Sequence, residues 1–166
     1  EERKEQPDVP GVTNFRHQPV GHWAVEALRD GKRFGFIASA DHAGVARAGI
    51  LVEKLSRTGL YEALKDKRCF GTTGLSMRLT FHCNDRFMGQ SVECETANFR
   101  LKAVAAEPIK ELQIVRNGEL VEQVNGRAGE LEYRWGVEKE ETGEFWFCRL
   151  IFENGEMAWT SPIWLD

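Results

Sequence analysis

The chain has 166 residues, and its 22 Lys and Arg residues against 26 Asp and Glu residues give a net charge of −4. This balance argues against a non-specific nucleic-acid binder, because such proteins need a basic surface for the phosphate backbone. No apolar stretch approaches the roughly 20 residues that a membrane-spanning helix needs. We therefore expect neither a nucleic-acid partner nor a membrane partner, and the composition indicates no cellular compartment.

The first 20 residues predict an irregular arm. The opening run from Glu1 to Pro7 is charged and lacks apolar periodicity, and the chain does not begin with Met. We therefore expect the C-terminal part of a longer protein, although a processed or engineered boundary would look the same. His17 lies in a loop near proline and His22 opens an amphipathic segment, so neither is chosen as a site residue.

Residues 21–74 predict a mixed α/β segment. Helices are expected over 22–30, where Gly31 ends the apolar pattern, and over 58–67, where Thr58 can act as the N-cap. Strands are expected over 34–38 and 49–53, where apolar runs occur. The pattern changes character near Gly74, so we expect a separate unit after it.

Residues 75–166 predict an antiparallel β-sandwich, because short alternating runs recur with turn residues between them. Asn117-Gly118 and Asn154-Gly155 are hairpin-turn signals. The apolar run 145–152 predicts a central strand, and Pro162 predicts a bulge or an edge. The expected strands are 77–83, 91–95, 99–105, 112–116, 120–124, 131–135, 145–152 and 157–164.

A carboxylate and an imidazole, Asp41 and His42, follow the predicted strand 34–38. Ligand groups of α/β architectures collect at the carboxyl ends of strands, so this pair predicts a metal or catalytic site. The alternative is that Asp41 caps a turn and His42 is an ordinary loop residue. Adjacent residues on a regular strand point to opposite faces, so both could bind one metal only if the chain leaves the strand at Asp41.

The order of several motifs resembles the PHP superfamily (polymerase and histidinol phosphatase type), specifically its PHP-like group of unknown function. The motifs are Gly35-Phe36-Ile37-Ala38-Ser39-Ala40-Asp41-His42, Leu60-Tyr61-Glu62-Ala63-Leu64, and Arg68-Cys69-Phe70-Gly71-Thr72-Thr73-Gly74, with closing segments 114–118 and 158–164. The resemblance covers roughly residues 21 to 166. It implies an α+β chain in which 21–74 closes a PHP-like β/α barrel and 75–166 forms the β-sandwich.

The resemblance implies the C-terminal portion of a metal-dependent, phosphoesterase-like hydrolase. Asp41 and His42 match its late metal-binding motif, although the family often places one residue between the two. In the full-length protein a divalent ion (Zn, Mn or Fe) would activate water against a small phosphorylated or ester substrate. The family's earlier His-x-His pair would lie upstream of Glu1, whereas a catalytic zinc normally takes three protein ligands. This chain alone is therefore expected to be inactive, with or without bound metal, and to need the upstream barrel portion or another copy of itself.

Three further residues are candidates for the catalytic site. Arg68 could clamp an anion, because its planar fork donates two hydrogen bonds at once. Thr72 and Thr73 could donate hydroxyl or backbone hydrogen bonds from a loop flanked by glycine. The alternative is that this loop only leads into the sandwich and that Arg68 pairs with a surface carboxylate.

The second hypothesis is a non-catalytic β-sandwich binding or assembly module with a vestigial Asp-His pair. Tryptophans could stack on a ligand, but their aliphatic neighbours on predicted strands favour packing instead. His82 alternates within strand 77–83 and is expected to be a strand surface residue. Cys83 and Cys94 lie on strands that could be neighbours, so a disulfide is expected only if the protein is exported. The tryptophans concerned are Trp135, Trp146, Trp159 and Trp164.

Overall fold

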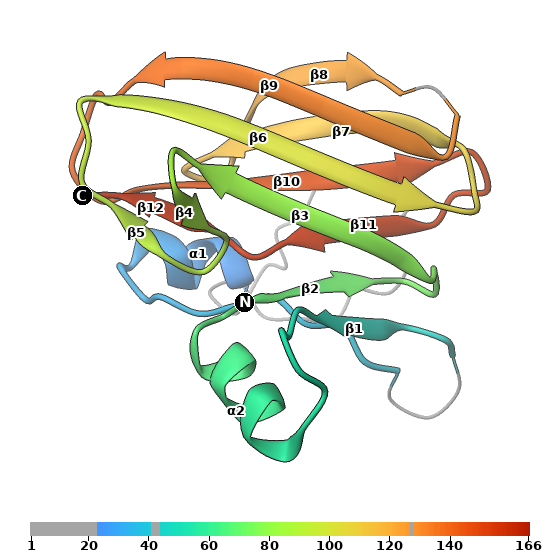
Figure 1. The fold of residues 1–166 in the computed structure, drawn as a ribbon. Helices are drawn as coiled ribbons and strands as arrows, with labels where there is room; N and C mark the ends of the chain where they lie inside the picture. The colour runs from blue at the N-terminus through green and yellow to red at the C-terminus, as the bar shows by residue number, and fades with distance from the viewer. Residues whose placement is uncertain (1–22, 41–43, 127) are drawn as a thin grey trace, which may run out of the picture.

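The computed structural model describes residues 23–40, 44–126 and 128–166, so the predicted arm lies outside the described residues. Two β-sheets pack face to face (Figure 1), and the helices are α1 (Ala24–Arg29) and α2 (Arg57–Lys65). The strands are β1 (Arg47–Ile50), β2 (Cys69–Thr72), β3 (Met77–Cys83), β4 (Arg86–Phe87), β5 (Ser91–Val92), β6 (Thr96–Ala105), β7 (Ile109–Arg116), β8 (Glu119–Asn125), β9 (Glu130–Glu138), β10 (Glu144–Phe152), β11 (Met157–Thr160) and β12 (Ile163–Leu165).

The larger sheet, called sheet A, has the order β1-β2-β11-β10-β12-β5, and β7 joins β10 to β8. The smaller sheet, called sheet B, has the order β4-β3-β6-β9 and is antiparallel throughout. Buried and exposed residues alternate along β6, so one face of sheet B packs inward and the other faces outward. The β-sandwich predicted from the sequence after residue 74 is therefore confirmed, and its strands pair antiparallel except for the short parallel pair of β5 and β12.

Aromatic rings and aliphatic side chains fill the space between the sheets. The ring of Phe99 stacks on Phe81 and on Trp135 and approaches Trp146 of sheet A, with centroids 5.5, 5.0 and 5.1 Å away. Leu79 and Leu101 of sheet B and Leu112 and Leu150 of sheet A are fully buried in the same cluster. Burial of this apolar surface is the main force that holds the sheets together.

The predicted central strand and turns are confirmed. Strand β10 pairs with β7 on one side and with β11 and β12 on the other. Asn117 and Gly118, with φ of 51° and 84°, form the two-residue turn between β7 and β8. Gly155 has φ of 84° in the turn between β10 and β11. Pro162 lies in the break between β11 and β12, where a residue without an N–H is tolerated.

The predicted β/α barrel segment is wrong. A barrel needs parallel strands linked through helices, whereas β1 and β2, on either side of α2, pair antiparallel. Strand β2 also pairs antiparallel with β11, so this part of the chain extends sheet A of the sandwich. Residues 34–38 form no strand, and the predicted strand over 49–53 is observed at 47–50.

The segment predicted as strand 34–38 instead covers the outer face of sheet A. Phe36 packs edge-on against Phe147 with ring centroids 5.2 Å apart, and its backbone N–H donates to Ser161 Oγ at 2.8 Å. Leu28 of α1 is buried in the same apolar cluster. The apolar run in the sequence reflects burial on this face rather than membership of a sheet. The cluster, here called the cover cluster, comprises Leu28, Val115, Phe145, Phe147 and Trp164, with Val25, Phe34, Phe36 and Trp159 against it.

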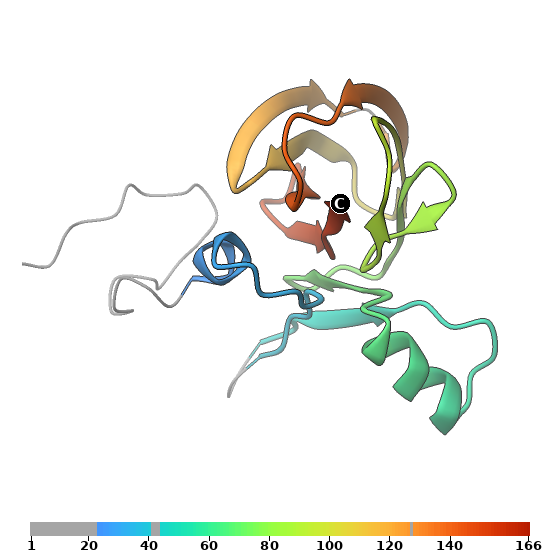
Figure 2. The ribbon, with the colours of Figure 1, turned by 90° about the vertical axis from the view of Figure 1, so that its left-hand side faces the viewer.

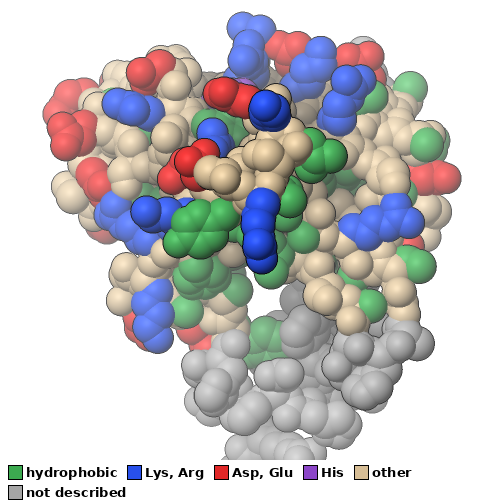
Figure 3. All heavy atoms as spheres, turned by 60° about the horizontal axis from the view of Figure 1, so that its bottom comes forward, with side chains coloured by type: hydrophobic (Ala, Val, Ile, Leu, Met, Phe, Trp, Pro, Cys, Tyr) green, Lys and Arg blue, Asp and Glu red, His purple; other side chains and the backbone are tan. Residues whose placement is uncertain are grey.

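Helix α2 projects from the sandwich beside β1 (Figure 2). Its N-cap is Ser56 rather than the predicted Thr58, because Ser56 Oγ accepts from Gly59 N–H at 3.0 Å. Leu55 and Tyr61 are 81% and 68% exposed in this region. Figure 3 shows hydrophobic side chains among Lys and Arg side chains on the underside of the molecule. In the described ranges, no helix is long and apolar enough to cross a membrane.

Candidate binding site on the outer face of sheet B

The predicted metal ligands Asp41 and His42 lie outside the described residues. Among residues 23–40, 44–126 and 128–166, no group of three or more His, Cys, Asp or Glu side chains could hold a metal ion. The metal site therefore stays a prediction from the sequence.

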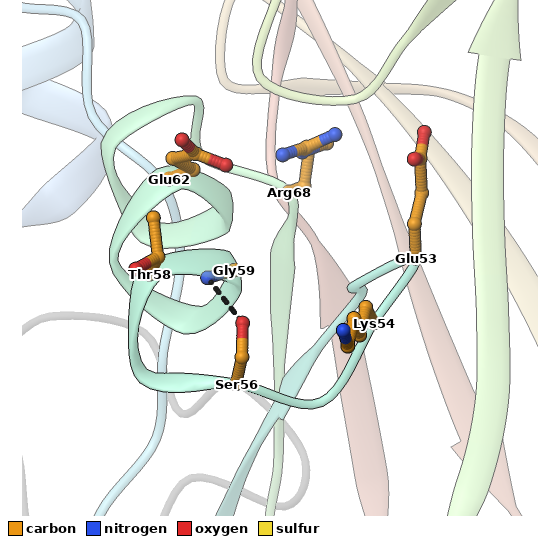
Figure 4. A pocket seen from close by; sticks show the side chains of 7 residues that line it. All are labelled: Glu53, Lys54, Ser56, Thr58, Gly59, Glu62 and Arg68. Carbon is orange, nitrogen blue, oxygen red and sulfur yellow. Dashed lines mark hydrogen bonds between the residues drawn. The ribbon is translucent and has the colours of Figure 1, made fainter.

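Arg68 lies in a hollow of about 300 Å³ beside the N-terminal turns of α2 (Figure 4). Its side chain extends between Glu62 of α2 and Glu53 of the loop after β1. Its Nη2 lies 3.4 Å from Asp66 Oδ2, which is the carboxylate pairing that the sequence left open as an alternative. Acidic side chains on both sides weaken the attraction of this hollow for an anion.

Thr72 and Thr73 hold the end of β2 to its surroundings. Thr72 is buried, and its hydroxyl donates to Leu75 O at 3.1 Å. The Thr73 hydroxyl donates to Glu156, and it accepts from Met157 N–H at 2.9 Å. Both hydroxyls are thus engaged in hydrogen bonds within the chain, and the structure does not bring them together with the guanidinium of Arg68 in one hollow.

The cysteines and tryptophans have mainly packing roles. Cys69, Cys83, Cys94 and Cys148 are free, and burial, with Cys94 beside it, raises the pKa of Cys83 to about 12. Trp146 and Trp164 are buried, whereas Trp135 and Trp159 are half-buried. The expectation that the tryptophans pack, rather than form an exposed row, is confirmed.

A row of three basic side chains crosses the outer face of sheet B. His82 of β3 is directly opposite Arg100 of β6, and Arg100 is directly opposite Arg134 of β9. Directly opposite residues of an antiparallel pair have Cβ atoms only about 4.5–5.5 Å apart, and like charges there destabilise the sheet. The register therefore places the like charges of Arg100 and Arg134 side by side, which destabilises the sheet, and acidic neighbours offset only part of this cost.

The acidic neighbours of this row are unevenly distributed. Arg134 Nε and Nη2 donate to Glu132 Oε1 at 3.0 and 2.6 Å, so this guanidinium has a partner. Lys102, the next outward residue of β6, pairs with Glu130 at 3.5 Å. Arg100 is exposed and makes no hydrogen bond or ion pair with any described residue, although its charge helps to lower the pKa of Glu132, the carboxylate that Arg134 holds.

The row borders a hollow of about 580 Å³ whose lining contains no acidic residue in the described part of the chain. Two lining residues have buried ring nitrogens without a hydrogen-bond partner among the described residues, His82 Nδ1 and Trp135 Nε1. Burial lowers the pKa of His82, and the charge of Arg100 lowers it further. The lining residues are His82, Asn84, Asn98, Phe99, Arg100, Arg134 and Trp135.

Two asparagines, Asn84 and Asn98, form one wall of the hollow. Asn84 has φ of 51°, in the left-handed region that asparagine tolerates. Its Oδ1 accepts from Asn98 N–H at 3.0 Å, and its amide donates to Thr96 O at 3.2 Å. The ends of β3 and β6 are thereby tied together beside the basic row.

Sequence reasoning considered two lining residues, His82 and Trp135, and gave neither a binding function. His82 was expected to be a strand surface residue, and its half-buried side chain on the outer face confirms this. The basic residues of the site lie on three strands, so only the pairing register brings them together. The sequence does indicate that His82, Arg100 and Arg134 each stand at an outward-facing polar position of a strand with alternating apolar and polar residues.

Comparisons with known proteins give little functional information. No family model matches the chain. It is 26% identical over 176 residues to an uncharacterised protein of Chlamydia pneumoniae and 26% identical over 178 residues to one of Chlamydia trachomatis. Each match covers 86% of this chain and 28% of the relative, so the chain spans about 28% of the length of these proteins.

Two solved structures show a weak likeness. Both are of the CARDB domain of one Pyrococcus furiosus protein: a crystal structure in complex with di-metal ions and a solution NMR structure. Their TM-scores are 0.37 and 0.34, with 11% and 12% identity. The matches cover 55% and 54% of this chain and 89% and 97% of the domain. At these scores the likeness carries no argument about this chain.

Proposed function

We propose that this chain is a non-catalytic binding module and that the outer face of sheet B is its ligand-binding surface. The observation that carries the proposal is the basic row of His82, Arg100 and Arg134 beside a hollow without acidic lining. Strands hold these side chains in a fixed register, which suits recognition by preorganised groups.

The arrangement of the two outer faces supports this choice. The outer face of sheet A is occupied by the chain itself, since Leu28 and Phe36 pack onto it through the cover cluster. No helix or loop from the described ranges lies across the lining residues of the sheet B hollow, where Arg100 remains exposed. The hollow is also within the size range of small-molecule sites, about 300–1,000 Å³.

The chemistry of the hollow supports binding rather than bond cleavage. Its polar side chains are two guanidiniums, an imidazole and two amides, which mainly donate hydrogen bonds. A hydrolytic site commonly uses a carboxylate or imidazole as a general base toward water. Among the described lining residues, His82 is the one imidazole and there is no carboxylate; burial and the charge of Arg100 lower the pKa of His82.

The proposal is tested by screening small charged and neutral molecules against the 166-residue chain by amide NMR shifts. We expect ligands to shift the amides of β3, β6 and β9 around His82, Asn98 and Arg134. A matched screen of Asn98→Asp, which adds a negative charge to the wall, should lose anionic ligands. Ligands that shift only other surfaces, or anionic ligands that bind the variant equally well, would contradict the proposed surface.

A further inference from the structure

We infer that the hollow on sheet B recognises a phosphate group, as free phosphate or as a phosphate ester. This inference rests on the proposed function and adds the chemical class of the ligand. Phosphate carries about −1.5 to −2 charges at neutral pH and offers several acceptor oxygens. The hollow offers positive charge and hydrogen-bond donors, because basic side chains from three neighbouring strands lie beside it.

Arg100 is the main anchor in this inference. It is the central member of the basic row and makes no ion pair with a described residue, so its planar fork can donate to two oxygens of one ligand. The unfavourable proximity of Arg100 and Arg134 becomes favourable when a multiply charged anion lies between them. Arg134 keeps its Nη1 available while Nε and Nη2 contact Glu132.

His82 supplies the second observation. Its ring Nδ1 is buried without a hydrogen-bond partner among the described residues, and its side chain lies in the same row as Arg100 beside the hollow. A buried polar group without a partner costs free energy that a hydrogen-bonding ligand can recover after a small side-chain adjustment. An anion beside His82 would also favour its protonated form and thereby add a second donor.

The number and charge of the donors favour phosphate over a carboxylate. A single carboxylate carries one negative charge and is fully matched by one bidentate arginine. Two arginines opposite each other and an adjacent imidazole supply more positive charge and more hydrogen-bond donors than one carboxylate can use. The hollow is also larger than one oxyanion, so an organic group attached to the phosphate can lie against the asparagine wall of Asn84 and Asn98.

The test is isothermal titration of the 166-residue chain with inorganic phosphate, glycerol phosphate and acetate at constant ionic strength. Arg100→Gln removes the anchor charge. Arg78→Gln is the matched control, because Arg78 is an exposed arginine of β3 on the same outer face, opposite Val104, and outside the hollow lining. Arg100→Lys keeps the positive charge but loses the planar guanidinium that donates two hydrogen bonds at once. Circular dichroism confirms that each variant is folded.

We expect saturable phosphate binding that Arg100→Gln weakens at least about tenfold, that Arg100→Lys weakens less, and that Arg78→Gln changes less than about twofold. Tighter binding of glycerol phosphate identifies an ester as the ligand, and tighter binding of inorganic phosphate identifies the free anion; both support the inference. Equal weakening by Arg100→Gln and Arg78→Gln, acetate binding as tight as phosphate binding, or no saturable binding overturns it. Neutral ligands that still map to this face would overturn the phosphate class while leaving the binding surface intact.

Discussion

The two outer faces of the sandwich differ in whether other parts of the chain cover them. The face of sheet A presents aromatic side chains and buries them under α1 and residues 34–36. The face of sheet B presents polar and charged side chains and stays open around Arg100. An apolar face must be covered to be stable in water, whereas a polar face can remain free for a ligand. Covering the apolar face of sheet A therefore leaves the outer face of sheet B as the surface available for binding.

The two sheets also differ in whether their charged side chains have partners within the chain. Near the start of β10, the buried carboxylate of Glu144 accepts from the backbone N–H groups of Glu140 and Glu141 at 2.6 and 2.7 Å and from Trp146 Nε1 at 3.1 Å. Arg116 Nε lies 2.9 Å from it. In this network the charges of Glu144 and Arg116 are paired, whereas Arg100 on sheet B makes no ion pair with a described residue and is only near the carboxylate of Glu132.

The largest effect should come from breaking the cover of sheet A. Phe147→Ala removes a ring that is 6% exposed and packs against Phe36. We expect the free energy of unfolding to fall by about 3–5 kcal/mol in urea denaturation. Thr80→Ala, on the outer face of sheet B, is the control and should lower it by no more than about 1 kcal/mol. A loss below about 1 kcal/mol for Phe147→Ala would show that the cover is loosely held.

Removing the buried charge of Glu144 should have the next largest effect. Burial alone would raise the pKa of Glu144, but the backbone N–H groups, Trp146 and Arg116 outweigh it, so the pKa is lowered. A lowered folded-state pKa stabilises the protein above the carboxyl's ordinary pKa and loses this contribution as pH falls through the folded value. We expect Glu144→Gln to cost about 1.5–3 kcal/mol at pH 7.

The pH dependence checks this prediction. Urea denaturation between about pH 7 and pH 3 should show a steeper acid loss of stability for the wild type than for Glu144→Gln. Parallel pH profiles for the two proteins would mean that other carboxyl groups, and not Glu144, cause the acid loss.

A smaller effect of opposite sign is expected on sheet B. Arg100→Thr removes the like-charge opposition with Arg134 and introduces a β-branched residue that suits a strand. In chloride buffer without phosphate, we expect the free energy of unfolding to rise by about 0.2–1 kcal/mol. Arg78→Thr provides the comparison, since it makes the same change opposite Val104. A decrease for Arg100→Thr alone would show that Arg100 stabilises the empty face.

The smallest effect is expected from the predicted metal pair. If the chain is a binding module, Asp41→Ala with His42→Ala should leave its metal content by elemental analysis and its melting temperature unchanged. Metal present in the wild type and lost in the double variant would instead favour the metal-dependent hydrolase hypothesis.

The sequence predicted the sandwich well because its signals are local. Strand β3 was predicted at its observed bounds, and Asn117-Gly118 marked a turn through its tolerance of positive φ. The barrel prediction failed at residues 34–38, since a short apolar run gives the same signal whether it joins a sheet or packs on its face. Long-range pairing, such as β2 with β11, leaves no trace in the local pattern.

The candidate site was harder to predict than the fold. His82, Arg100 and Arg134 each look like ordinary exposed positions of an alternating strand. Their proximity depends on the register of two strand pairs, and a shift of one residue would move each side chain to the other face. The sequence alone could therefore supply the residue types but not their arrangement.

The most direct test of the binding surface is the melting temperature of the wild type and Arg100→Gln in phosphate and in chloride buffer of equal ionic strength. A ligand that binds only the folded state stabilises it in proportion to its occupancy. We predict that phosphate raises the melting temperature of the wild type and leaves that of Arg100→Gln almost unchanged. An equal rise in both proteins would show that phosphate acts on the whole surface and would contradict a specific site on sheet B.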